Sequence, residues 1–242
     1  MLSAFFSEEK GMRILIKDNN RPIALLYGDS AVIRKYNHHH DKLGRFASSD
    51  GSSGEGILGS LGRHKAGDKV MITEQAIKKV SEKASKYLSD DENKALHDIN
   101  VAVLTESMKH NNSNEVAMAF DGKETSHAVF GDQFSVDVEA DAEIHHFLLA
   151  SPSRSVVLTH NHPGESSFSE DDLVLFMRYR SIECMSIVTN QGKCFSLTKT
   201  KDMGDTKDFY SYAKKLDKCY NEKQRVDLLI SKLYNYGVRY ER

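Results

Sequence analysis

Hydrophobic and polar residues alternate at the start of the chain in two short runs with turn-forming residues between them. The stretch MRILIKDNNRPIALLYG, residues 12–28, places one β-rich run on each side of Asp18-Asn19-Asn20, which is typical of a β-hairpin. Residues 1–36 are too few to bury a hydrophobic core of their own. The pattern therefore predicts an N-terminal β-rich appendage over residues 1–36.

The periodic pattern then stops and glycine and serine become frequent. Seven of the chain's 15 glycines lie between Tyr36 and Asp68, with serines among them. This composition predicts a flexible linker over residues 37–69. The run His38-His39-His40 lies inside it, and we interpret these histidines as solvated residues that can bind metal adventitiously.

A helical pattern covers the next segment, residues 70–113. Its two parts are TEQAIKKVSEKASKYL, residues 73–88, and SDDENKALHDINVAVLTESMKH, residues 89–110. Thr73 and Ser89 are in N-cap positions, and Ser89 has a glutamate three residues later, as in a capping box. In the first part, apolar residues recur every three or four positions, which predicts one buried stripe formed by Ile77, Val80, Ala84 and Leu88.

Strand and helix patterns alternate from residue 114 to residue 200, which predicts an α/β domain with a mixed β-sheet flanked by helices. After it, residues 201–242 predict C-terminal helices. The expected elements of the domain are two strands around Asp121-Gly122 in EVAMAFDGKETSHAVFG, a helix in DAEIHHFLLAS, a buried strand in SVVLTH, a helix in SEDDLVLFMRYR and a hairpin about Asn190-Gln191-Gly192.

Composition and charge exclude several classes of function. The net charge of −2 gives no basic field for nucleic acid, and no apolar run reaches the length that spans a bilayer. The N-terminus has no basic segment ahead of its apolar residues, so it does not resemble a signal peptide. Cys184, Cys194 and Cys219 are odd in number and lack a CxxC spacing, so we expect a cytoplasmic protein without disulfides.

The candidate chemistry lies in THNHPGESSFSEDD, residues 159–172. His160 and His162 are two positions apart at a strand end, so both side chains point to the same side. Ser169 is a natural N-cap for the next helix, and Asp172 lies in the first turn of that helix. Two imidazoles and one carboxylate leave one tetrahedral position for water, the arrangement of a catalytic rather than a structural zinc site.

This stretch has two other interpretations. The Ser169-x-x-Asp172 spacing is equally that of a capping box, and an HxH alone is more often incidental than metal-binding. The letters H-N-H also occur in HNH nucleases, but those spread their residues over a longer ββα unit, and the near-zero net charge argues against tight DNA binding. The combination HxHP, short loop and SxxD favours a metal site.

H-N-H-P followed by S-x-x-D resembles the signature of the JAMM, or MPN-plus, metalloproteases, in its bacterial RadC-like form. The resemblance covers residues 114–198 and implies the JAMM fold, with zinc held by His160, His162 and Asp172. It further implies that Ser169 stabilises an oxyanion and that a glutamate on an earlier strand activates water. Glu115 is the favoured candidate for that glutamate; the alternatives are Glu124, Glu139 and Glu143.

The resemblance implies a zinc-dependent peptidase or isopeptidase acting on a protein or peptide. The chain lacks the D-H-x-I block of RadC proteins, which places it in a side branch. HDKLGRFASS, residues 40–49, resembles a segment of bacteriophage head and portal-associated proteins, so a phage-encoded protein in the host cytoplasm is expected. A ubiquitin-like tail and a phage structural protein both stay open as substrates. The alternative function is a phage head or assembly protein, or an MPN-type scaffold without catalysis.

Overall fold

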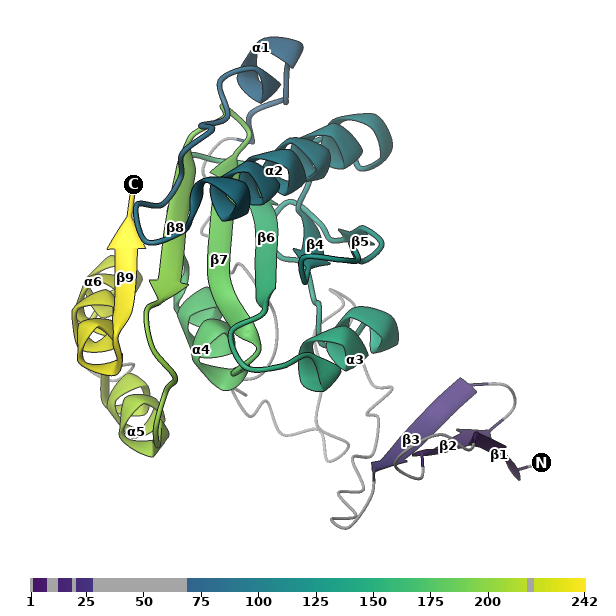
Figure 1. Ribbon diagram of the computed structural model, residues 1–242. Coiled ribbons are helices and arrows are strands. Elements are labelled where there is room, and N and C mark those ends of the chain that lie inside the picture. Colours follow the sequence, from purple (N-terminus) through teal and green to yellow (C-terminus); the bar gives the residue numbers. More distant parts are fainter. Residues whose placement is uncertain (1, 8–12, 19–20, 28–68, 217–219) are drawn as a thin grey trace. The chain divides into compact units, whose positions relative to one another are not determined.

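The computed structural model describes residues 2–7, 13–18, 21–27, 69–216 and 220–242 (Figure 1). The chain forms two compact units, residues 1–56 and 57–242. The expected linker, with its histidine run and the phage-like segment, falls almost entirely outside the described residues, as does Cys219. The domain boundaries expected from the sequence therefore stay predictions.

The N-terminal unit contains a three-stranded antiparallel sheet. Its strands are β1 (Leu2–Ser7), β2 (Arg13–Asp18) and β3 (Arg21–Tyr27), in the order β1-β2-β3. The β2–β3 pair is the expected hairpin, which is thus confirmed. The sequence analysis did not assign β1 to a strand.

The second unit is built on a six-stranded mixed sheet in the order β5-β4-β6-β7-β8-β9. Only the central pair, β6 with β7, is parallel; the other neighbours are antiparallel. The expected mixed α/β architecture is confirmed. The strands are β4 (Val116–Phe120), β5 (Val129–Phe130), β6 (Val156–His162), β7 (Ile182–Thr189), β8 (Cys194–Lys199) and β9 (Val238–Glu241).

Helices cover both faces of this sheet. Alternate residues of β4 belong to different cores: Val116 and Met118 pack with α2 (Asp90–His110), whereas Ala117 and Ala119 pack with the helices of the other face. Two-sided burial explains why β4 is apolar throughout. The helices of the second face are α3 (Ala142–Ala150), α4 (Glu170–Arg178), α5 (Lys207–Leu216) and α6 (Glu222–Leu233).

The helix expected over residues 73–88 is wrong in its length. Helix α1 spans only Glu74–Ile77, although Thr73 caps it as expected. Beyond it the backbone bonds to distant side chains: the N–H of Ser85 donates to Oδ1 of Asn93, and the N–H of Lys86 donates to the carboxylate of Glu241. These tertiary partners replace helical hydrogen bonds, and the apolar stripe still reaches the core through Val80 and Leu88.

The second helix of this segment follows the sequence closely. Helix α2 begins after Ser89 with the expected capping box, in which Ser89 and Glu92 exchange side-chain to backbone hydrogen bonds. None of the helices in the described ranges is both long and apolar enough to cross a membrane.

Two further expectations need correction. The second strand after Asp121-Gly122 is reduced to the two residues of β5, because residues 121–128 are irregular apart from a single bridge between Phe120 and Thr125. The C-terminal segment is not helical throughout: after α6 and a 3-10 turn (Tyr234–Tyr236), β9 adds an edge strand to β8. Gly237 has a left-handed backbone, with φ of 78°, which ends the helical segment and lets the chain turn into β9.

Helix α4 is anchored at its C-terminal end by a buried lysine. Nζ of Lys199 donates to the carbonyls of Phe176 (2.9 Å) and Tyr179 (2.6 Å) and lies 4.3 Å from the ring centroid of Phe176. Burial, and then the charge of Arg154, lowers the pKa of Lys199 well below its usual value. The lysine supplies donors to carbonyls that the end of a helix leaves unpaired.

We expect Lys199→Ala to lower the free energy of unfolding by about 3 kcal/mol, because two buried carbonyls lose their donor and a cavity is left. Urea denaturation measures the change. Lys199→Met, which fills the space without donors, separates the two contributions. Wild-type stability in the methionine variant would mean that the two hydrogen bonds contribute nothing.

Candidate metal centre

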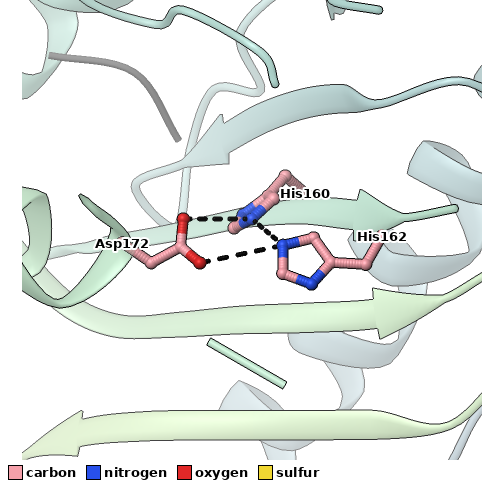
Figure 2. A group of neighbouring side chains, drawn as sticks. All are labelled: His160, His162 and Asp172. Atoms are coloured by element: carbon pink, nitrogen blue, oxygen red, sulfur yellow. Dashed lines mark hydrogen bonds and ion pairs between the residues drawn. The ribbon is translucent and has the colours of Figure 1, made fainter. Parts of the chain in front are cut away.

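Strand β6 ends in His160-Asn161-His162, and the pleat of the strand separates the three side chains. His160 and His162 point to the face of the sheet covered by α4, with their Nε2 atoms 2.9 Å apart (Figure 2). Asn161 points to the opposite face, toward α2, where it bonds Ser107. The expected side-by-side placement of the two imidazoles is confirmed, and it follows from the two-residue period of a strand.

Asp172 completes the group from the first turn of α4. Its Oδ1 lies 3.4 Å from Nε2 of His160, and its Oδ2 lies 3.7 Å from Nε2 of His162 (Figure 2). The same carboxylate accepts the N–H of Ser169 at 2.6 Å, while Oγ of Ser169 accepts the N–H of Asp172 at 3.1 Å. Ser169-x-x-Asp172 is therefore a capping box and part of this cluster at once, and the box fixes the direction of the carboxylate.

The three side chains could hold a metal ion. They form the one such group found among the described residues, with one ligand atom of each within 4.8 Å of the others. Two nitrogens at 2.0–2.1 Å from one tetrahedral ion lie about 3.3 Å apart, close to the spacing seen here. Nδ1 of His162 lies 3.1 Å from the carbonyl oxygen of Ser166. A proton on Nδ1 would donate there, and the lone pair of Nε2 would then be the one that coordinates a metal.

Glu115 lies beside this group, at the entry to β4. Strand β4 pairs with β6 in the register Ala117↔His160, and continuing that register by two residues puts Glu115 opposite His162 on the same face. Its side chain is fully buried, and neither carboxylate oxygen has a hydrogen-bond partner among the described residues. Glu115 is therefore not a solvated acid at the start of the strand.

Burial raises the pKa of Glu115 well above its usual value, and the charges of Asp172 and then Asp132 raise it further. The three other candidate glutamates have different surroundings. Glu139 bonds Arg178 and Tyr179, each at 2.5 Å, while Glu124 and Glu143 are exposed. Of the four, Glu115 alone combines full burial, an unpartnered carboxyl and an electrostatic interaction with Asp172.

The sequence analysis missed the polar layer on the other face of β6. Asn161 and Thr159, which flank His160, are fully buried there, and each bonds a buried asparagine, Asn190 and Asn100 respectively. The available signal was a run of polar residues inside a strand that must be buried on both faces, because such residues need hydrogen-bond partners.

Comparison of the chain with models of protein families, with characterised proteins and with solved structures gives no match. The resemblance to JAMM metalloproteases therefore rests on the motif residues alone.

The raised pKa of Glu115 predicts a pH-dependent effect of Glu115→Gln on the metal-free protein. Below the usual pKa of 4.5 the carboxyl is protonated in both the folded and the unfolded chain, so its ionisation costs nothing. As the pH rises above 4.5 the unfolded chain ionises first and the fold loses stability. We expect the free energy of unfolding of the variant, compared with that of the wild type, to be higher at pH 8 than at pH 4. Urea denaturation with a chelator present measures both differences. An equal difference at both pH values would contradict the raised pKa.

Proposed function

We propose that the protein is a zinc-dependent peptidase or isopeptidase of the JAMM type. The observation that carries this proposal is the convergence of His160, His162 and Asp172 with Glu115 on one face of the sheet. Within the described residues the Glu115 carboxyl has no hydrogen-bond partner. Imidazole and carboxylate are the ligand types of catalytic zinc sites, and three protein ligands leave a position for a further ligand.

The donor set and its surroundings fit such an ion. The two imidazoles and the carboxylate of Asp172 are buried and approach one another closely, and a cation between them would compensate the buried negative charge of the carboxylate. A zinc ion held there would supply Lewis acidity, which acidifies water toward a pKa of about 7 and polarises a carbonyl.

The chain's own residues would supply proton transfer and charge stabilisation. In its ionised form Glu115 takes a proton from the attacking water, and its protonated form then delivers that proton to the leaving amine. Its buried carboxyl, unbonded within the described residues, is free for both roles. The hydrogen bond from the N–H of Asp172 uses a lone pair of Ser169 Oγ, so the Ser169 O–H can donate to the developing oxyanion.

The substrate of this proposal is a protein or peptide. A ubiquitin-like C-terminal tail follows from the JAMM resemblance, and a phage structural protein follows from the resemblance of residues 40–49 to phage head proteins. The hydrolysed bond would be an isopeptide bond in the first case and a main-chain peptide bond in the second.

One observation favours a second candidate, a scaffold in which a metal stabilises the fold without catalysis. Glu115, His160, His162 and Asp172 are each 0% exposed. A substrate carbonyl reaches this group only if the residues that cover it move aside. A scaffold needs no such opening.

The experiment that tests the proposal combines metal analysis with hydrolysis. Wild-type protein is dialysed against a weak chelator, analysed for zinc and incubated with a peptide library derived from proteome digests, with products identified by mass spectrometry. About one zinc per chain, and cleavage that stops when zinc is stripped and resumes on reloading, support the peptidase. Zinc without cleavage supports a scaffold that a metal stabilises. No zinc even after reloading rules out the peptidase and leaves a scaffold without metal.

A further inference from the structure

Asn161, the residue between the two histidines, holds both peptide groups that flank Glu115. Its Oδ1 accepts the N–H of Val116 at 2.7 Å, and its Nδ2 donates to the carbonyl of Asn114 at 3.0 Å. A backbone N–H can only donate and a carbonyl can only accept, so these two bonds fix which way the Asn161 amide faces. The side chain is fully buried.

The Asn161 side chain bonds the β4 segment at the point where the backbone hydrogen bonds between β4 and β6 end. The ladder between β4 and β6 runs as far as Ala117↔His160, and beyond that pair the Asn161 amide bonds β4 in place of a strand backbone. Glu115 itself is held on its other edge, since its N–H donates to the carbonyl of Asp132 and its carbonyl accepts the N–H of Gly131, each at 2.9 Å. Its backbone is thus fixed on both sides.

Asn190 links the same segment to His162. Its backbone N–H donates to the carbonyl of His162 at 3.0 Å, and its Nδ2 donates to the carbonyl of Ser113 at 2.8 Å. Its Oδ1 accepts from Asn161 at 2.7 Å. Asn112 and Ser113 have φ of 49° and 59°, a left-handed conformation that costs free energy in non-glycine residues and persists only where the surroundings enforce it.

We propose that Asn161 is a positioning residue, which keeps the Glu115 carboxyl at a fixed place relative to the metal ligands His160 and His162. The histidines and Asn161 lie on one strand. Any shift of β6 therefore moves the metal ligands together with the Asn161 amide that holds the backbone on both sides of Glu115. The inference deepens the proposed function and rests on it. A buried amide that only satisfies its hydrogen bonds would stabilise the fold without coupling Glu115 to the metal.

A double-mutant cycle on zinc affinity separates these two roles, with affinity measured by competition against a chromophoric chelator. Glu115→Gln removes a nearby negative charge, and we expect it to weaken zinc binding about tenfold in the wild-type background, the lower end of effects from groups around a metal's ligands. In the Asn161→Ala background Glu115 is no longer held, so we expect the effect of Glu115→Gln to shrink to about twofold.

Asn100→Ala is the matched control. Asn100 is also a fully buried asparagine below β6, where its Oδ1 accepts the hydroxyl of Thr159, but no hydrogen bond joins it to residue 114 or 116 among the described contacts. We expect the tenfold effect of Glu115→Gln to persist in this background. If Asn161→Ala does not fold, Asn161→Asp enters the same cycle, since it keeps the acceptor for Val116 and loses the donor to Asn114.

Amide hydrogen exchange of Val116, measured by NMR on the metal-free protein, gives a readout that does not depend on zinc. We expect Asn161→Ala to accelerate this exchange at least tenfold more than Asn100→Ala does. A tenfold effect of Glu115→Gln that survives Asn161→Ala, or that Asn100→Ala reduces equally, overturns the inference. If wild type binds no zinc, the proposed function fails, and the exchange of Val116 alone decides whether Asn161 holds this segment.

Discussion

His160→Ala/His162→Ala is expected to abolish stoichiometric zinc binding, with a loss of affinity of more than about 1,000-fold. Structural zinc sites bind with free energies on the order of 10 kcal/mol, shared among a few ligands, so removal of two of three ligands takes away most of it. Asp172 alone then remains of the cluster within the described residues. Elemental analysis after dialysis and competition with a chromophoric chelator measure the loss.

Thermal denaturation gives a second measure of the same prediction. A ligand that binds only the folded state at 100 times its Kd stabilises that state by about 2.7 kcal/mol. Zinc should therefore raise the Tm of the wild type by several degrees and leave that of the double variant unchanged. An equal rise in both proteins would place the zinc elsewhere.

Two control variants test whether the zinc is bound by His160 and His162 and not by other histidines. His97→Ala/His110→Ala removes two imidazoles from α2, outside the cluster, and should retain one zinc per chain. The run His38-His39-His40 can bind zinc adventitiously, so a variant with serines at these three positions should also retain one zinc per chain. Zinc that disappears with this run, and not with His160 and His162, would contradict the assignment of the site.

Glu115→Gln is expected to reduce hydrolysis of any peptide that the wild type cleaves by about 100- to 10,000-fold, the range that a general acid–base group contributes. The variant keeps the size of the side chain and loses its ability to take up a proton. Zinc should remain bound at one per chain, because the three ligands are intact. Rates on a library-derived peptide, measured at matched zinc occupancy, give the reduction.

Glu139→Gln is the matched control for this prediction. It makes the same chemical change in a half-buried glutamate whose partners are Arg178 and Tyr179 rather than the metal cluster. We expect its rate to stay within about threefold of wild type, since no general acid–base group is removed. Full activity in Glu115→Gln, or an equal loss in Glu139→Gln, would reassign the base.

Local rules in the sequence predicted which three side chains form the candidate metal group. The two-residue period of a strand sends His160 and His162 to one side, and the N-cap preference of serine starts α4 so that Asp172 falls in its first turn. The same rules located α2, α3 and the β7–β8 hairpin, because each depends on residues close in sequence.

The tertiary structure decided what depends on distant pairing. Helix α1 is short because the residues after it bond Asn93 and Glu241, and β9 forms because β8 offers it a free edge. Four glutamates were candidates from the sequence; the register of β4 against β6 brings Glu115 alone beside the histidines. The bonds of Asn161 to Val116 and Asn114 likewise depend on how β4 lies against β6. The sequence thus predicted the candidate ligands through local periodicity and capping. The position of Glu115 and the hydrogen bonds that hold its backbone follow from strand register, which only the assembled sheet defines.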